Sequence, residues 1–365
     1  MIISAVATAA TLAGCSGGSP AKGFVESCDS LFEARYADAL VGAAPGGAVL
    51  IAKGDSIIYE RYFGLADMVT GEPVDENTLF NIASVSKQFT VAALLQQDVS
   101  MDEPASAYFS YPQEFWSRVT LGHLASHSSG IPDARDRSDR QRCVYADEEQ
   151  SVAYFPEVDS TLFEPGTAYD YLNPSFILLA KVVEQKSGQD FYEYMRRSVF
   201  KPAGMASTVY FSPDGMPAHT AHGYAPDGQG GWMEYDYGEE TFFATRPDGG
   251  IYSTARDMLR WERALAEGRV LTPERLALAY SPHVDVSASP YCDYQRRPNT
   301  WYGYGWFVER QPGLPEKVYH TGDNGGFQAY VAKYPSADIS IIVLENRHDR
   351  DRWQMAQAID SLLFR

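Results

Sequence analysis

The sequence predicts an α+β protein whose sheet is assembled from both ends of the chain. Two observations lead to this prediction. Runs rich in β-forming residues lie at about 40–82 and again within 241–365, while the segment of about 83–240 between them consists of helical periodicity and loops. With 365 residues, of which 45% are hydrophobic and 13% aromatic, the chain can bury a large core. A cleft is expected where the inserted helical block meets the sheet.

The first element is the N-terminal run "MIISAVATAATLAGC", which is apolar and uncharged. It is too short for a mature membrane span, so residues 1–15 are expected to be an export signal, followed by a Gly/Ser-rich tether over 16–35. The letters "LAGC" resemble the lipobox of bacterial lipoproteins, in which cleavage leaves Cys15 for lipid attachment. No Lys or Arg precedes the apolar run, which departs from the usual signal. The expectation is a periplasmic or cell-surface lipoprotein, with secretion as a soluble protein as the alternative.

The body of the domain, 36–365, begins with the two β-rich runs of "GGAVLIAKGDSIIYERYFGLAD", which predict a hairpin turning at 53–55. A helix is expected to open near Ser84, and Gly188 interrupts two later helical runs. The stretch 224–240 has turn residues without a period and is expected to be a surface loop. Four further β-rich runs and an amphipathic last helix follow, in the order "WYGYGWFVE", "KVYHTGD", "GFQAYVAKYP", "ISIIVLEN" and "DRWQMAQAIDSLLFR".

Charge and cysteine content exclude several classes of partner. The net charge of −18 opposes nucleic acids and anionic lipid surfaces, so membrane contact is expected only through a lipid anchor. Besides the lipobox cysteine, Cys28, Cys143 and Cys292 form an odd set, which allows one disulfide or three thiols. The absence of a Cys-x-x-Cys pair gives structural zinc no support. His123 and His127 have a spacing that suits a metal, but the Glu of His-Glu-x-x-His is absent, so we expect no metal and no cofactor.

The chemistry of the chain is expected to centre on Ser84 and Lys87 in "FNIASVSKQF". A serine hydroxyl is a poor nucleophile without a nearby base, and residues three apart meet on a helix surface. The alternative reading is a helix N-cap and a solvated lysine. Because apolar residues flank the motif, Lys87 is expected to be partly desolvated, which favours the neutral amine that can accept a proton.

Two further motifs accompany this pair. In "AYDYLNPSF", Tyr171 and Asn173 are two apart, so in extended backbone a phenol and an amide point to the same side. In "VYHTGDNGGF", His320, Thr321 and Gly322 follow a β-type run. A glycine on a strand that lines a site lets substrate approach the backbone, whose N–H groups can stabilise an oxyanion.

These three motifs, in this order and at these separations, resemble those of the serine β-lactamase and penicillin-binding peptidase superfamily, and the Tyr-x-Asn motif resembles its class C β-lactamase-like branch. The segments 124–133, 247–261 and 302–308 also resemble that family. The resemblance implies an antiparallel sheet flanked by helices with an inserted, mainly helical region.

Catalytic roles follow from the resemblance. It implies that Ser84 attacks an acyl carbonyl and forms an acyl-enzyme while Lys87 helps to take its proton. Tyr171 is then expected to work with Lys87 as acid and base in turn, and Asn173 to orient Lys87 and bind substrate.

The resemblance also assigns the residues around the substrate. The backbone N–H groups of Ser84 and Asp323 are expected to form the oxyanion hole. His320, Thr321 and Gly322 are expected to contact the substrate. The family's β-lactamases usually carry a lysine at the first position of this motif, and a histidine supplies positive charge only in part near pH 7.

This departure favours an esterase or a D-amino-acid peptidase acting on a small-molecule or peptide substrate. A β-lactamase or a D-alanyl-D-alanine carboxypeptidase is the alternative within the same chemistry. An alternative of another class is a non-hydrolytic penicillin-binding or cell-wall sensor lipoprotein. The oligomeric state is left open.

Overall fold

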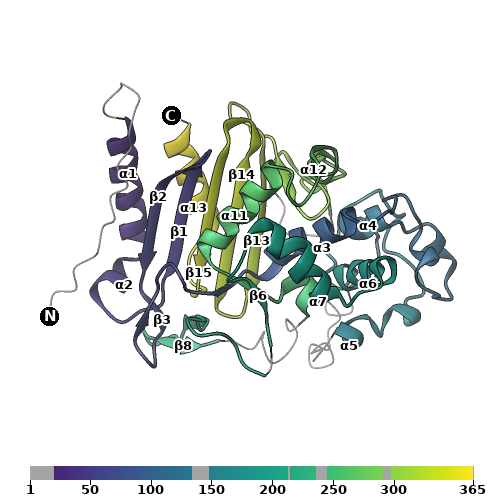
Figure 1. The fold of residues 1–365 in the computed structure, drawn as a ribbon, viewed down its shortest axis with the longest axis horizontal. Helices are drawn as coiled ribbons and strands as arrows, with labels where there is room; N and C mark the ends of the chain where they lie inside the picture. The colour runs from purple at the N-terminus through teal and green to yellow at the C-terminus, as the bar shows by residue number, and fades with distance from the viewer. Residues whose placement is uncertain (1–19, 134–147, 213, 236–244, 291–296, 365) are drawn as a thin grey trace.

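The computed structural model describes residues 20–133, 148–212, 214–235, 245–290 and 297–364 (Figure 1). The predicted export signal and Cys15 lie outside these residues, as do Cys143 and Cys292. Among the described residues, the helices are too short or too polar to cross a membrane.

An antiparallel sheet forms the centre of the molecule (Figure 1). Strands from the two ends of the chain meet within it, since β15 pairs with β1 along their whole lengths, for example Leu50 with Ile342. The predicted assembly from both ends is therefore confirmed. The eight strands found among the described residues are, in order across the sheet, β10 (Val284–Asp285), β11 (Thr300–Tyr302), β12 (Phe307–Glu309), β13 (Lys317–Asn324), β14 (Phe327–Tyr334), β15 (Ile339–Glu345), β1 (Gly47–Lys53) and β2 (Ser56–Phe63).

The predicted local elements are found in this sheet. β1 and β2 form the expected hairpin, and Gly54 in its turn has a φ of +56°, a conformation that glycine adopts without strain. All seven residues of β15 are buried. This strand has few polar residues because both faces of the sheet are covered by other elements.

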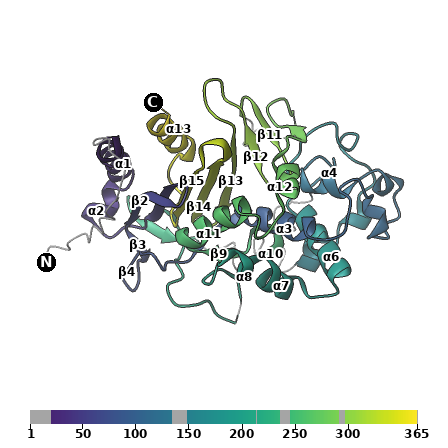
Figure 2. The same ribbon diagram turned by 45° about the horizontal axis from the view of Figure 1, so that its top comes forward.

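Helices cover both faces of the sheet (Figures 1 and 2). α13 (Arg352–Leu363) and α1 (Pro20–Arg35) pack with one apolar cluster, and α11 (Ala255–Ala266) packs against β1 and β15 with a second, larger cluster. Trp261 of α11 stacks on Phe89 with ring centroids 4.1 Å apart. This stacking joins the sheet layer to the helical region.

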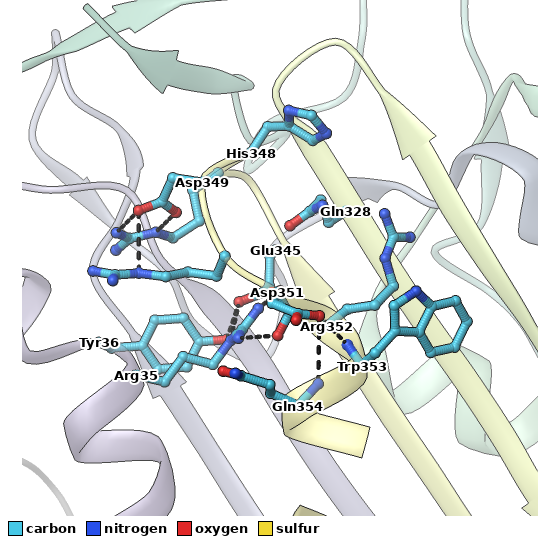
Figure 3. Close-up of polar contacts among 12 residues, drawn as sticks. Arg35, Tyr36, Gln328, Glu345, His348, Asp349, Asp351, Arg352, Trp353 and Gln354 are labelled. Carbon is cyan, nitrogen blue, oxygen red and sulfur yellow. Dashed lines mark hydrogen bonds and ion pairs between the residues drawn. The ribbon is translucent and has the colours of Figure 1, made fainter. Parts of the chain in front are cut away.

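The N-terminal segment corrects one sequence prediction. Residues 16–35 were expected to be a tether, but α1 is a helix from Pro20 onward. Cys28 and Phe32 are buried against the sheet, and Arg35 and Tyr36 both donate hydrogen bonds to Glu345 of β15 at 2.7–2.8 Å (Figure 3). The Gly/Ser composition extends only a few residues past Cys15. The segment that follows is polar overall, but packing of its apolar face against the sheet stabilises the helix.

Cys28 has a free thiol. Burial, together with the neighbouring charge of Asp29, raises the pKa of Cys28 to about 12. A protonated, buried thiol of this kind is a packing group, so one of the three cysteines of the odd set has a structural explanation.

The inserted region is mainly helical, as expected, and lies to one side of the sheet (Figure 1). Gly188, with a φ of +68°, ends α6 before α7 begins, so the predicted interruption is confirmed. The remaining helices described here are α2 (Ala37–Val41), α3 (Ser86–Leu95), α4 (Leu121–Ala125), α5 (Glu148–Val152), α6 (Ser175–Ser187), α7 (Phe191–Tyr194), a π-helical turn (Met195–Phe200), α8 (Lys201–Ala203), α10 (Arg246–Gly249) and α12 (Pro273–Tyr280).

Short strands outside the large sheet pair into small sheets. The stretch expected to be a surface loop at 224–240 forms a short hairpin as far as Glu234, and 236–240 lies outside the described residues. The strands of the small sheets are β3 (Leu65–Asp67) with β4 (Glu72–Pro73), β5 (Phe80–Asn81) with β9 (Ile251–Ser253) and β6 (Val209–Tyr210), and β7 (Tyr224–Pro226) with β8 (Trp232–Glu234).

A buried carboxyl group on α11 makes the stability of the fold depend on pH. Burial raises the pKa of Glu262 to about 7, with Lys333 of β14 opposing the shift, while Tyr280 of α12 lies close enough to feel its charge. The unfolded chain releases this proton near pH 4.5, whereas the folded chain keeps it until about pH 7. Folding is therefore favoured most below pH 4.5, and this contribution is lost as the pH rises through 7.

We expect Glu262→Gln to remove a pH-dependent loss of stability on the order of 3 kcal/mol between pH 4.5 and 8. Urea unfolding of both proteins at pH 5 and pH 8 measures this, with the exposed Glu267→Gln as the control. An equal pH dependence in wild type and Glu262→Gln would contradict the assignment.

Candidate active site

Ser84 lies at the start of the central helix, as the sequence predicts. A 3₁₀ turn over Ala83–Val85 leads into α3, and Ser84 is half-buried while every residue of α3 is buried. Ala83 has a φ of +46°, and its N–H donates to Asn81 Oδ1 at 2.7 Å. A non-glycine residue in this region costs about 1–3 kcal/mol, and such strain is common beside functional groups.

Strand β9 holds this segment on its other side. The N–H of Ile82 donates to the carbonyl of Ile251 at 2.9 Å, and the N–H of Ile251 reaches Ser86 Oγ at 3.3 Å. Ser86 is therefore buried, and its hydroxyl accepts a backbone hydrogen bond. Ser84 is the hydroxyl of this helical turn that remains partly accessible.

Lys87 is fully buried, and its ammonium group contacts three separate segments. Nζ donates to Ser84 Oγ at 3.0 Å, to Asn173 Oδ1 at 2.6 Å and to the carbonyl of Asp248 at 2.8 Å. The helical i,i+3 spacing predicted the first contact. It could not predict the third, which comes from backbone of α10.

These contacts prepare Lys87 to exchange a proton with the serine. A carbonyl and the amide oxygen of Asn173 can only accept, so two protons of Lys87 are directed away from Ser84. When the ammonium loses its remaining proton, the amine lone pair is directed at Ser84 Oγ and can accept the hydroxyl proton. The predicted contact between Ser84 and Lys87 is therefore present, in a geometry that suits a nucleophile and its base.

Tyr171 lies beside this pair on the segment that precedes α6. Lys87 Nζ is 4.9 Å from the centroid of the Tyr171 ring. His127 holds the segment in three ways: its carbonyl accepts from Asp170 N–H at 2.8 Å, its Nδ1 accepts from Leu172 N–H at 3.0 Å, and its ring packs on Tyr171 with centroids 4.0 Å apart. His127 therefore orients Tyr171.

The two histidines that suggested a metal have structural roles instead. Nδ1 of His123 accepts from the N–H of Thr120 in a capping box at the start of α4. Nδ1 of His127 accepts from the N–H of Leu172, beside Tyr171. Within the described parts of the chain, acidic, histidine and cysteine side chains do not gather into a metal-binding group.

Strand β13 passes against the nucleophile segment at Gly322. A Cβ atom at this position would lie 2.3 Å from the carbonyl oxygen of Ile82 and 3.0 Å from the Cβ of Ala83. No side chain fits in this space, so glycine is required for the strand to reach Ser84. Partner strand β12 pairs with β13 only at 317–319, which leaves the edge of 320–324 facing this segment.

The register of β13 predicts which N–H groups face the site. Asn324 pairs with Phe327 across a two-residue turn in which Gly325 has a φ of +52°. The closing pair of such a turn is hydrogen-bonded, and bonded and non-bonded pairs alternate along an antiparallel ladder. Asp323 therefore belongs to a non-bonded pair, and its N–H points away from β14 toward the edge where Ser84 lies, as an oxyanion donor requires.

His320 differs from the sequence expectation in its charge. It is buried, Nδ1 lies 2.6 Å from the carbonyl of Thr321 and Nε2 lies 2.8 Å from the hydroxyl of Tyr302. Since the carbonyl can only accept, Nδ1 carries the proton and Nε2 accepts from Tyr302. Burial, aided by the charge of Lys87, lowers the pKa of His320 to about 3, so the expected partial positive charge near pH 7 is absent.

Sequence reasoning missed three contributors to the site: the carbonyl of Asp248, the orienting ring of His127 and the hydroxyl of Tyr302. Each lies in a segment whose resemblance to the family was visible, in "PDGGIYSTARDMLRW", "LASHSSGIPD" and "YGYGWFV". The letters alone did not indicate their roles, because a backbone carbonyl and two packed rings act through tertiary contacts.

Comparison with known proteins agrees with this geometry. The family model described as Beta-lactamase matches residues 32–363. Penicillin-binding protein 4* of Bacillus subtilis is 28% identical over 340 residues, which cover 87% of this chain and 72% of that protein. A D-aminopeptidase of Gluconobacter oxydans is 27% identical over 336 residues, which cover 87% of this chain but only 59% of that longer protein.

A solved structure supports the same relationship. The crystal structure of a penicillin-binding protein from Bacillus halodurans aligns with a TM-score of 0.73 and 31% sequence identity, over 87% of this chain and 96% of that one. The family match spans nearly all of the described fold and contains Ser84, the buried Lys87 and strand β13. The chain therefore belongs to the β-lactamase family and is a serine hydrolase.

Proposed function

We propose that the chain hydrolyses an amide or ester through an acyl-enzyme at Ser84, with D-amino-acid peptides, amides or esters favoured over β-lactams. The observation that carries this proposal is the buried Lys87 ammonium group, 3.0 Å from Ser84 Oγ and held in place by Asn173 and Asp248. A buried charged side chain is costly, and a solely structural role gives no reason to direct it at a serine hydroxyl.

The acylation step starts from the neutral amine form of Lys87. Ser84 Oγ bonds to the carbonyl carbon of the substrate, and the hydroxyl proton passes to the lone pair of Lys87 Nζ, which becomes an ammonium group. The carbonyl oxygen becomes an oxyanion that accepts from the N–H groups of Ser84 and Asp323, each of which contributes about 3 kcal/mol to lowering the barrier. Tyr171 delivers a proton to the leaving amine or alcohol as its bond to carbon breaks. The product remaining on the enzyme is the ester of Ser84.

Deacylation reverses the proton movements with water in place of the leaving group. Tyr171 and Lys87 together take a proton from water, the hydroxide adds to the ester carbon, and the bond to Ser84 Oγ breaks as that oxygen regains its proton. The packing of His127 on the Tyr171 ring and its bond to Leu172 support this role, because an acid–base group needs a fixed position.

The preference for substrates other than β-lactams rests on His320. Its ring is neutral near pH 7 and both of its nitrogens have protein partners. A substrate carboxylate therefore gains less at this position than it would from a lysine ammonium. The relatives are named as D-aminopeptidases, a penicillin-binding protein and a β-lactamase, so their names do not select one substrate class. The neutral charge of His320 favours substrates that do not need a cation for a carboxylate at this position.

We also propose that the protein is exported and anchored through a lipid on Cys15. The support is the uncharged apolar run that ends in the lipobox-like "LAGC". α1 begins at Pro20, so the folded domain would stand a few residues from the anchor.

For the catalytic assignment, purified protein without its first fifteen residues is assayed with p-nitrophenyl butyrate, nitrocefin, a D-alanine amide and a D-alanyl-D-alanine peptide. We expect turnover of the ester and the amide to exceed that of nitrocefin, and Ser84→Ala to reduce it at least about a thousandfold. The exposed Ser117→Ala is the matched control. Labelling by a fluorophosphonate probe without turnover of any substrate would instead indicate a non-hydrolytic sensor.

Tyr171→Phe is expected to lower kcat by about 10²–10⁴-fold, the usual contribution of a positioned acid or base, while thermal unfolding stays close to wild type. Tyr108→Phe, which removes a phenol hydroxyl that donates to Glu103 away from Lys87, is the control. Stopped-flow measurement of acylation and deacylation distinguishes the two steps. Near-wild-type rates in Tyr171→Phe would show that another group transfers the proton.

Cys15→Ser is expected to release the full-length protein from the membrane fraction into the soluble periplasmic or extracellular fraction, since the lipid attachment point is lost. Incorporation of radiolabelled palmitate followed by cell fractionation measures this. An unlabelled wild-type protein found in the soluble exported fraction would favour simple secretion.

A further inference from the structure

We infer that Arg352 is a positioning residue for the oxyanion hole, because it holds the peptide group between Gly322 and Asp323 and strengthens its N–H as a donor. This inference deepens the proposed function and rests on it. Neither the catalytic motifs nor the family segments noted in the sequence include Arg352, which is the first residue of α13.

The guanidinium group of Arg352 contacts both residues that share this peptide group. Nη1 donates to the carbonyl oxygen of Gly322 at 3.0 Å, and Nη2 forms an ion pair with Oδ1 of Asp323. The side chain is only 12% exposed, so solvent screens these contacts less than it would on an open surface. Figure 3 shows Arg352 at the start of α13, with Gln328 and His348 at the same end of the sheet.

The geometry of a peptide group connects this contact to the site. The carbonyl of Gly322 and the N–H of Asp323 belong to one planar unit and point in opposite directions. The carbonyl faces β14 and Arg352, so the N–H faces Ser84. A cationic donor on the carbonyl polarises the whole unit, and hydrogen bonds in such chains strengthen one another. The N–H of Asp323 becomes a stronger donor in a fixed orientation.

The carboxylate of Asp323 gives a second reason for a cation beside the oxyanion hole. Its carboxylate is attached to the residue whose N–H must stabilise a developing negative charge, so an uncompensated Asp323 would oppose catalysis. Arg352 pairs with it, His348 Nε2 lies 3.5 Å from Oδ1, and Gln328 donates at 3.2 Å. Partial burial opposes ionisation, but the bond from His348 and the charge of Arg352 outweigh it and lower the pKa of Asp323.

The position of Arg352 is determined by the attachment of its helix. Asp351 caps α13 by accepting from the N–H groups of Trp353 and Gln354 at 2.7 and 3.4 Å. Further along, Asp360 accepts from the buried Lys317 of β13 at 2.9 Å. The helix that carries the cation is thus fixed to the strand that carries the oxyanion donor.

The test uses Arg352→Met and Arg352→Lys, assayed with the best substrate of the panel above. Arg350→Met is the matched control, since Arg350 lies in the same segment, is 42% exposed and pairs with Asp349 away from the strand. For each protein, kcat and KM are measured together with the inhibition constant of a boronic acid, whose tetrahedral adduct on Ser84 places an oxygen in the oxyanion hole. Thermal unfolding reports on the fold.

We expect Arg352→Met to lower kcat at least about tenfold and to weaken boronate inhibition by a similar factor, with KM changed less than about threefold. Arg352→Lys keeps the charge and should recover part of the loss. The double variant Arg352→Met/Asp323→Asn should also recover part of it, because the uncompensated carboxylate is removed. Arg350→Met should behave as wild type.

Three results would overturn the inference. They are unchanged kcat and boronate inhibition in Arg352→Met, a change in KM alone that is confined to substrates with a carboxylate, and no recovery in either Arg352→Lys or the double variant. All three require an active wild type. A wild type without Ser84-dependent reaction is a separate outcome, which overturns the proposed function and this inference with it.

Discussion

The site depends on the burial of the Lys87 ammonium group. A buried cation must be surrounded by acceptors, because its loss of hydration otherwise costs several kcal/mol. Its acceptors are Ser84, three positions earlier in the chain, and Asn173 and Asp248, which lie 86 and 161 positions later. Lys87 can therefore be buried only when three elements are in place: α3, α10 and the segment that precedes α6. The requirement couples the folding of the helical region to the formation of the catalytic pair.

A second constraint is the close approach of β13 to the nucleophile segment. The Gly322 backbone lies so near Ile82 that any side chain would collide with it. The strand is held at this distance by its pairing with β14 on one side and by α13 on the adjoining face. Since β14 and β15 join β1 in one sheet, both ends of the chain contribute to the position of one N–H group.

Charge in the site is arranged by burial as much as by residue type. His320 is neutral because its ring is enclosed and hydrogen-bonded, whereas Lys87 keeps contacts suited to an ammonium group a short distance away. Asp323 and Arg352 compensate each other beside the oxyanion strand. Lys87 thus acts on the reacting atoms and Arg352 on the backbone of the strand, while the side chain of His320 offers no charge to a substrate carboxylate.

The sequence by itself determined the broad order of sheet and helical segments, including the β1–β2 hairpin, the helix opening near Ser84 and the interruption at Gly188. It also indicated Ser84, Lys87, Tyr171 and Asn173 as candidate site residues, through their local spacing together with the resemblance of their motifs to the family. It failed for α1, whose helix is stabilised by packing on the sheet. Only the tertiary structure decided the charge of His320, the packing of His127 on Tyr171 and the contact of Arg352 with Gly322. Each depends on desolvation or on a partner far away in the chain.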